Sequence, residues 1–342
     1  MGGERGSFVD RANIGCSSPM TPNDRMRTAF LFPGQGSQVV GMGRDVADRV
    51  AQAAAIYEKS NTLLGFDLRK LCFEGPSERL NTTAMSQPAI FVTSIAILSA
   101  MKTHPATAGI TPDVCAGLSL GEYTALYAAG AIGFEECLHL VHIRGQAMQA
   151  AADATAGGMV SLIGLDEEKV QALCHEAAQG ELLQPANFNC PAQIVISGAK
   201  AACDRAEVLA AKYGAMKAVR LEVAGAFHTP MMAPAAEALD NALSACRFSD
   251  PSQVRVMSNA SADCYPSAKA IRPGLVRQLT SPVLWQRCIE KLLEDGVGRF
   301  YEIGPGKVLT GLMRRINRRV EIVNISNMGS LSGLAHEAES RK

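Results

Sequence analysis

A serine, a histidine and an arginine have the type and context best suited to chemistry. Ser119 lies in Gly117-Leu118-Ser119-Leu120-Gly121, which has the GxSxG spacing of a nucleophile elbow. In such an elbow a sharp strand-to-helix turn lifts the serine hydroxyl out of the sheet, and small flanking residues let the turn close. The same string also occurs in ordinary tight turns, so its context has to decide.

The context of Ser119 is that of an elbow. The apolar segment Val114-Cys115-Ala116 predicts a buried strand before the string, and a helical pattern follows it over 122–129. Free amides and the positive dipole end at the start of that helix favour a developing oxyanion. The sequence therefore predicts that Ser119 is a nucleophile rather than a structural turn residue.

A serine nucleophile needs a base, and the chain has six histidines. His228 is the candidate, because its loop follows the end of a separate small unit predicted over 153–224 and so lies at the predicted cleft between the two domains. The alternative is a loop histidine bonded to nearby backbone. Several carboxylates lie between Ser119 and His228, so no triad acid can be chosen. Four other histidines lie in polar surroundings or on the helix that carries Arg144: His104, His175, His139 and His142.

Arg144 falls at the edge of the apolar stripe of a helix predicted over 134–152. A guanidinium that faces inward requires an anion. Two partners stay open at this point. One is a structural ion pair with a carboxylate such as Glu122; the other is a substrate carboxylate held bidentately, which would select a dicarboxylic acyl group.

Two glycine-rich loops fail the tests for nucleotide binding. The loop at 32–38 would need glycine at position 39, where Val39 stands, to match GxGxxG. The loop at 304–307 would need glycine in place of Tyr301 to be a Walker A motif. The first loop instead offers backbone amides at the edge of the sheet where an elbow's second oxyanion donor usually lies.

The elements that position these residues alternate between strands and helices, which predicts a mostly parallel α/β sheet. From Gly157 the order changes to strand, helix, strand, strand, helix, strand, the order of a ferredoxin-like unit. Its segments are 159–164, 166–178, 184–189, 193–197, 200–213 and 215–223. We therefore predict a large α/β domain interrupted by a small inserted domain, with a cleft between them.

The predicted boundaries follow from these patterns. The large domain covers 26–152 and 225–327, and the small subdomain covers 153–224. Residues 1–25 are polar and rich in Gly, Ser and Pro, which predicts a disordered extension. Residues 328–342 are predicted to be a loose C-terminal tail.

Composition excludes several classes of function. Lys and Arg total 33, as do Asp and Glu, so the zero net charge gives no indication of nucleic acid or an anionic membrane. The ten cysteines form no CxxC pair or His/Cys cluster, which predicts reduced thiols in a cytosolic setting and no metal site. The longest apolar stretch, 88–101, is too short to span a membrane.

Taken together, the motifs closely resemble those of malonyl-CoA:acyl carrier protein transacylases, over about residues 26–327. The resemblance implies an α/β-hydrolase-like parallel-sheet domain with an inserted ferredoxin-like (βαββαβ) subdomain. The motifs are Phe32-Pro33-Gly34-Gln35-Gly36-Ser37-Gln38, Ser86-Gln87-Pro88-Ala89, Gly117-Leu118-Ser119-Leu120-Gly121-Glu122-Tyr123, Arg144-Gly145-Gln146-Ala147-Met148-Gln149, Asn187-Phe188-Asn189, Phe227-His228 and Gly304-Pro305-Gly306-Lys307.

The resemblance also implies roles for the catalytic residues. Ser119 would be the nucleophile and His228 its general base. The main-chain carbonyl of Gln278 would orient the imidazole in place of an acid, and the amides of Gln35 and Leu120 would form the oxyanion hole.

Further residues are implied for the substrate. Arg144 would clamp the malonyl carboxylate, Gln87 and Asn189 would line the active site, and Phe227 matches the pattern of malonyl-type acyltransferases. Leu118 departs from the histidine that many members carry before the nucleophile, which bears on the shape of the acyl pocket.

The implied activity is ping-pong transfer of malonyl from malonyl-CoA to the phosphopantetheine thiol of acyl carrier protein for fatty acid elongation. No cofactor or metal is expected, and the partners are malonyl-CoA and acyl carrier protein, without nucleic acid or membrane. We expect a monomer in the bacterial cytoplasm, or in a plastid or mitochondrion of a eukaryote. The alternatives are a stand-alone acyltransferase of polyketide synthesis, a serine thioesterase or carboxylesterase, and a non-catalytic docking module.

Overall fold

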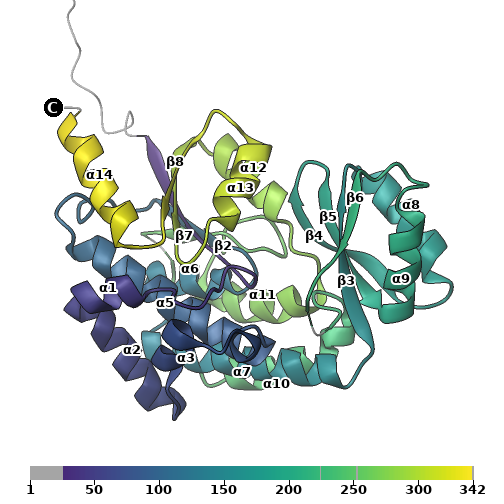
Figure 1. The fold of residues 1–342 in the computed structure, drawn as a ribbon, viewed down its shortest axis with the longest axis horizontal. Coiled ribbons are helices and arrows are strands. Elements are labelled where there is room, and N and C mark those ends of the chain that lie inside the picture. The colour runs from purple at the N-terminus through teal and green to yellow at the C-terminus, as the bar shows by residue number, and fades with distance from the viewer. Residues whose placement is uncertain (1–25, 224, 252, 341–342) are drawn as a thin grey trace, which may run out of the picture.

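Two sheets organise the chain, whose computed structural model describes residues 26–223, 225–251 and 253–340 (Figure 1). The larger sheet has five strands in the order β7-β2-β1-β8-β9, and every neighbouring pair is parallel. The strands are β1 Arg27–Phe32, β2 Val114–Gly117, β7 Arg255–Val256, β8 Val297–Ile303 and β9 Glu321–Ile325. This parallel sheet confirms the predicted α/β class.

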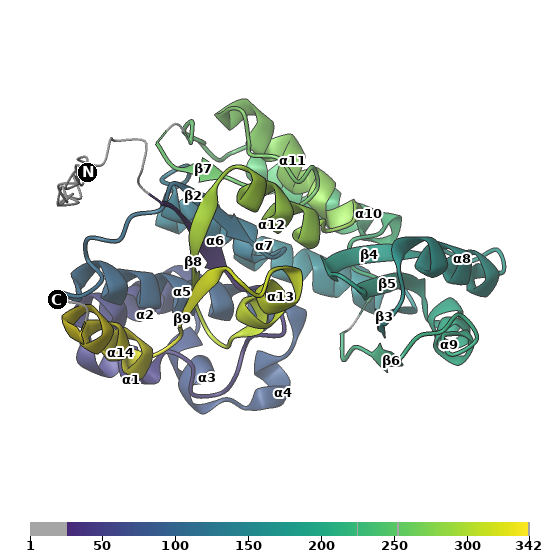
Figure 2. The same cartoon turned by 90° about the horizontal axis from the view of Figure 1, so that it is seen from above.

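Both faces of the parallel sheet are covered by helices, as parallel sheets require (Figure 2). Alternate residues of β1 show this directly: Phe30 and Phe32 join one buried cluster, and Ala29 and Leu31 join the other. The first cluster includes residues of α5 Thr83–Thr103, α6 Gly121–Ala128, α7 Phe134–Asp153 and α10 Ala233–Leu243. The second includes residues of α12 Trp285–Glu294 and α13 Val308–Ile316.

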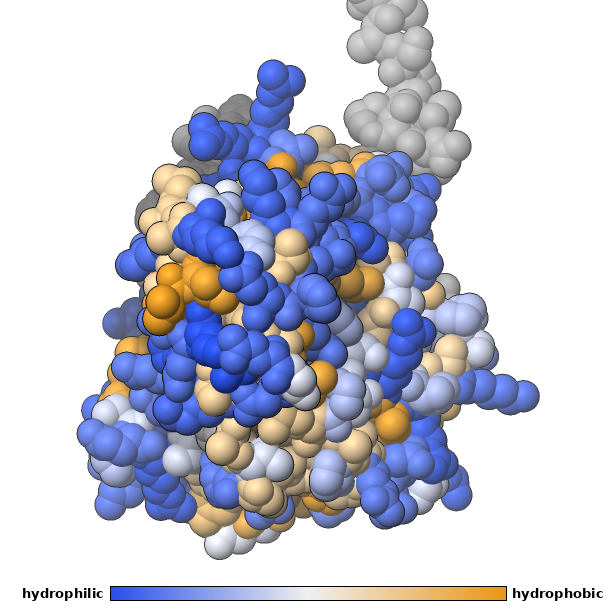
Figure 3. All heavy atoms as spheres, turned by 90° about the vertical axis from the view of Figure 1, so that its right-hand side faces the viewer, coloured by the Kyte–Doolittle hydropathy of each residue, from blue (hydrophilic) through white to orange (hydrophobic). Residues whose placement is uncertain are grey.

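The smaller sheet is antiparallel, with the order β4-β5-β3-β6. Its strands are β3 Gly157–Ile163, β4 Leu183–Cys190, β5 Gln193–Ala199 and β6 Lys217–Arg220. The helices α8 Glu167–Ala178 and α9 Lys200–Leu209 share a buried cluster with it. The βαββαβ order and this strand order confirm the ferredoxin-like unit. Figure 3 shows that this end of the molecule is mainly hydrophilic, with apolar residues scattered over it.

Helix α5 is longer than the apolar stretch that the sequence delimited. It has 21 residues and passes a length and composition test for a membrane span, although 83% of the tested window is buried inside the fold. Its most extensive packing partner is α7, which lies beside it in the first cluster. The prediction that this segment is too short to span a membrane was therefore wrong about length, and burial identifies α5 as a core helix.

The prediction of a loose tail over 328–342 was also wrong. Residues Met328–Ser340 form helix α14, in which Leu331 is fully buried. The amide of Met328 donates to Asp45 Oδ2 at 2.8 Å, so the start of this helix is tied to α1 Arg44–Arg49. Residues 1–25, predicted to be a disordered extension, lie outside the described residues.

The remaining helices all contribute residues to the first buried cluster. The helical segment before α3 Leu68–Glu74 is divided at Val50 into α1 and α2 Ala51–Leu64, because Val50 has extended backbone angles. The others are α4 Ser77–Leu80, the short 3₁₀ turn η1 Pro230–Met232 and α11 Ala268–Thr280.

Candidate active site

Ser119 sits on a strained turn between β2, which ends at Gly117, and α6, which begins at Gly121. Its φ of 50° lies in the left-handed region, which a non-glycine residue rarely adopts. A Cβ at Gly117 would stand 1.9 Å from the carbonyl carbon of Gly121, and one at Gly121 would stand 2.1 Å from the carbonyl oxygen of Phe32. Both glycines of the GxSxG string are therefore required by backbone contacts.

We expect Gly121→Ala to destabilise the fold by about 3 kcal/mol, because the backbone of Phe32 leaves no space for a methyl group. Denaturant unfolding followed by circular dichroism measures this loss. Gly311→Ala is the control, since a Cβ there meets nothing within 4 Å and the residue lies in helix α13. Equal stability of the two variants would contradict the steric explanation.

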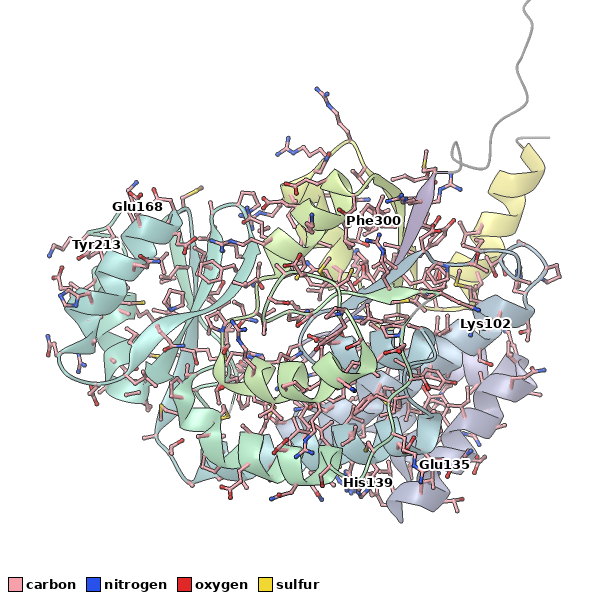
Figure 4. The ribbon with its side chains drawn as sticks, turned by 180° about the vertical axis from the view of Figure 1, so that it is seen from behind. Lys102, Glu135, His139, Glu168, Tyr213 and Phe300 are labelled. Carbon is pink, nitrogen blue, oxygen red and sulfur yellow. The ribbon has the colours of Figure 1, made fainter. Side chains whose placement is uncertain are left out.

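The structure places the hydroxyl of Ser119 beside the imidazole of His228. Ser119 Oγ lies 2.9 Å from His228 Nε2, and His228 Nδ1 lies 2.8 Å from the main-chain oxygen of Gln278. Because that carbonyl only accepts, Nδ1 carries the proton and Nε2 is free to accept one from the serine. His139, on the helix that also carries Arg144, is exposed on the outer face of the large domain (Figure 4).

Burial keeps His228 neutral. Desolvation, and next the positive charge of Arg144, lower the pKa of His228 to about 4 from 6.5, while its bond to the Gln278 carbonyl acts in the opposite direction. A neutral imidazole is the form that accepts a proton from a serine hydroxyl. His228 is thus in the basic form at neutral pH.

The pH dependence of acylation tests this assignment. If His228 is the base, we expect the acylation rate to fall as the pH falls through about 4, because protonation of Nε2 then removes the acceptor. Stopped-flow release of CoA measures this rate. A limb near 6.5, the pKa of an ordinary imidazole, would contradict a buried neutral base.

The two residues predicted to supply the amides of the oxyanion hole lie at the same cavity. Gln35 and Leu120 both line it, and neither amide has a hydrogen-bond partner among the described residues. The amide of Ser119 is occupied, since it donates to Asn259 Oδ1 at 2.6 Å. The first loop packs tightly on the elbow, because a Cβ at Gly34 would lie 2.3 Å from the carbonyl oxygen of Leu118. This arrangement suits a two-amide oxyanion hole.

Arg144 is 1% exposed and points at the serine. Its Nη2 donates to Ser119 Oγ and to Gln278 Oε1, each at 2.9 Å, and its Nη1 donates to Gln87 Oε1 at 2.6 Å. No carboxylate oxygen of the described residues lies within 4.0 Å of this guanidinium. The buried charge of Arg144 therefore does not form a direct ion pair with Glu122.

The cavity has a volume of about 490 Å³ and is lined from both domains. Asn189 and Phe227 line it, as does Leu118 before the nucleophile, and the Oδ1 of Asn189 has no hydrogen-bond partner. Gln87 does not line it: its buried side chain lies against Arg144 and Met148. Gln87 is therefore placed to hold Arg144 rather than to touch substrate, and the substrate contacts of Asn189 and Phe227 stay predictions.

Sequence reasoning missed a buried polar group behind the elbow. Asn259 accepts from the Ser119 amide, donates from Nδ2 to the Gly117 oxygen at 2.8 Å, and donates its own amide to Glu122 Oε2 at 3.0 Å. The hydroxyl of Tyr265 donates to Glu122 Oε1. The available signal was the position of Asn259 just past a short apolar run, where polar residues at the carboxyl ends of parallel strands gather.

Among the described residues, no group of three or more His, Cys, Asp or Glu side chains has the arrangement of a metal site. The cysteines described at nine positions are all unpaired, and most are buried. The described residues of the site therefore offer a serine, an imidazole, two free amides and one cation that no carboxylate contacts directly.

The comparisons with known proteins all indicate the same family. The acyl transferase domain family matches residues 29–332. The malonyl CoA-acyl carrier protein transacylase of Bacillus subtilis is 44% identical over 88% of this chain and 94% of its own. That of Escherichia coli is 40% identical over 91% and 98%.

Solved structures agree. A malonyl CoA-acyl carrier protein transacylase of Coxiella burnetii superposes with a TM-score of 0.86 at 38% identity, covering 90% of this chain and 96% of that one. A malonyl-transacylase in complex with a type II polyketide synthase acyl-carrier protein has a TM-score of 0.86 at 40% identity, covering 91% and 99%. The chain therefore belongs to the acyl transferase family, within the group of malonyl CoA-acyl carrier protein transacylases.

Proposed function

We propose that this protein transfers malonyl from malonyl-CoA to the phosphopantetheine thiol of an acyl carrier protein through an ester on Ser119. One observation carries the proposal. The Ser119 hydroxyl lies 2.9 Å from both a neutral imidazole nitrogen and a guanidinium nitrogen that has no carboxylate partner among the described residues. A nucleophile next to an available cation fits an acyl group with a negative charge at its far end.

The first half-reaction uses groups that the structure brings together. His228 Nε2 takes the serine proton as Oγ attacks the thioester carbonyl, and the amides of Gln35 and Leu120 stabilise the negative charge on the oxygen. The C–S bond of the resulting tetrahedral intermediate then breaks, and the proton on His228 passes to the departing CoA sulfur. The products are the malonyl ester of Ser119 and free CoA.

The second half-reaction reverses these steps with a different thiol. The thiol of the carrier protein gives its proton to His228 and attacks the ester carbonyl, and Ser119 leaves with that proton. One cavity thus serves two bulky thiols in turn. The groups of the chain and the two substrates account for every proton and bond in both half-reactions. We therefore propose a reaction without a metal or other cofactor.

Selectivity comes from charge in this proposal. A malonyl carboxylate gives the guanidinium of Arg144 an anionic partner, whereas acetyl would leave this desolvated cation with neutral acceptors only. A thioesterase would not need a cation beside its nucleophile. A role in polyketide synthesis stays an alternative, because a solved relative at 40% identity is in complex with a polyketide synthase carrier protein. The curated relatives named above are bacterial, which supports a cytoplasmic site of action in a bacterium.

Mass spectrometry of the intact protein after incubation with malonyl-CoA tests the proposal. We expect one malonyl adduct, which disappears when acyl carrier protein is added as malonyl appears on the carrier. Competition with acetyl-CoA measures the selectivity. Loss of the adduct to water at the same rate with and without carrier protein would favour a thioesterase instead.

A further inference from the structure

The buried cation of Arg144 and the buried carboxylate of Glu122 are kept apart by one side chain. Gln278 Oε1 accepts from Arg144 Nη2 at 2.9 Å, and Gln278 Nε2 donates to Glu122 Oε2 at 2.7 Å. All three residues are at most 1% exposed. The amide of Gln278 thus connects the two charges without letting them touch.

The hydrogen bonds around Gln278 allow one orientation of its amide. Besides Glu122, Nε2 donates to the main-chain oxygen of Ser119 at 3.0 Å. A turned amide would put Oε1 against two acceptors, the Glu122 carboxylate and the Ser119 carbonyl, and would put the amide NH₂ against the guanidinium of Arg144. The carboxylate of Glu122, together with the Ser119 carbonyl, therefore fixes the acceptor of Gln278 toward Arg144.

Glu122 does not depend on Arg144 for its own hydrogen bonds. Its carboxylate accepts from the Tyr265 hydroxyl, the Asn259 amide and Gln278 Nε2, which satisfies the acceptor demand of a buried anion. A direct pair with Glu122 would instead occupy the fork of Arg144 and compete with any substrate carboxylate. The observed arrangement supplies a nearby counter-charge and leaves the cation available.

We propose that Glu122 is a positioning residue for malonyl selection, acting through the side-chain amide of Gln278 to hold Arg144 beside Ser119. This inference rests on the proposed function and adds to it. The main-chain oxygen of Gln278 orients His228, so one residue aligns the base through its backbone and the carboxylate-binding cation through its side chain.

The test is Glu122→Gln in the full-length protein, with kcat and KM measured for malonyl-CoA and for acetyl-CoA. Glutamine keeps the size of the side chain but removes the negative charge that Gln278 Nε2 binds beside the Ser119 carbonyl. We expect the ratio of malonyl to acetyl kcat/KM to fall about tenfold or more, mainly through a higher KM for malonyl-CoA. Acetyl-CoA is the reference substrate, because it uses the same serine and histidine but offers Arg144 no carboxylate.

Gln278→Met is the second variant, and it keeps the test decisive if Glu122→Gln does not fold. It removes the amide but retains the main-chain oxygen that His228 uses. We expect a similar fall in the ratio, and the double variant to show no larger fall than either single one, because Glu122 acts through Gln278. Glu302→Gln is the matched control: Glu302 is equally buried, but it binds Leu309 and Thr310 amides at the start of α13, so we expect its ratio to be unchanged.

Equal losses for malonyl-CoA and acetyl-CoA in Glu122→Gln would overturn the inference, since they indicate general support of the elbow. An unchanged ratio in Gln278→Met, or additive losses in the double variant, would also overturn it. The proposed function is tested separately by the unaltered protein. If that protein forms no malonyl ester, both ideas fail; if it does and the ratio does not move, only the inference fails.

Discussion

Replacing Ser119 by alanine should abolish the covalent malonyl adduct and lower transfer to carrier protein by about 10⁴-fold or more. Alanine removes the hydroxyl oxygen that the structure places 2.9 Å from His228 Nε2, in the cavity that Gln35 and Leu120 also line. The remaining site can bind the thioester but has no oxygen to acylate. Incubation with labelled malonyl-CoA, followed by denaturing electrophoresis, measures the adduct.

Ser94→Ala is the control for this experiment. Ser94 is fully buried in helix α5 of the same domain, and its hydroxyl has no hydrogen-bond partner among the described residues. The Ser94→Ala variant should take up the malonyl label to the same extent as the unaltered protein. Retention of label in the Ser119 variant would show that another side chain is the nucleophile, and the role of His228 would fall with it.

Replacing Arg144 by alanine should remove the preference for malonyl over acetyl. We expect kcat/KM for malonyl-CoA to fall about a hundredfold to a thousandfold, because two charge-assisted hydrogen bonds to the substrate carboxylate are lost. The kcat/KM for acetyl-CoA should fall by a smaller factor. The ratio of acetyl to malonyl kcat/KM should therefore rise, because a buried cation without an anionic partner no longer opposes acetyl binding. Steady-state kinetics with both thioesters measure the change.

Arg144→Lys separates charge from geometry. Lysine keeps the positive charge but lacks the planar fork that also binds Gln87 and Gln278, so it should restore only part of the preference. A malonyl preference that survives in Arg144→Ala would contradict the clamp. The unneutralised guanidinium would then need a different anion.

Much of this site could be predicted from sequence because its signals are local. The glycine at 117 is dictated by atoms of the same turn, and the two-residue and 3.6-residue periods identify strands and helices within short windows. The order of those elements was enough to separate the parallel sheet from the inserted ferredoxin-like unit. The nucleophile, and the loop that carries His228, follow from such patterns.

Helix α14 shows a limit of local reading. The segment after Asn327 is rich in Gly, Ser and Ala, and its pattern favoured a loose tail. Leu331 nevertheless packs into the first buried cluster, and Asp45, far away in the chain, accepts from the amide of Met328. Tertiary packing therefore outweighs a weak local preference at this end of the chain.

By itself, the sequence determined the fold class, the elbow and the need of Arg144 for an anion. Only the tertiary structure decided that Glu122 is not the direct partner of Arg144. Arg144 binds Gln278 instead, which is 134 positions away, and this contact depends on how α7 and α11 both pack against α10. The same holds for Asn259, which meets the Ser119 amide across 140 positions because β7 and β2 are neighbours in the sheet. Local sterics are encoded in a few adjacent residues, whereas the charge environment of a buried group is set by every element that packs around it.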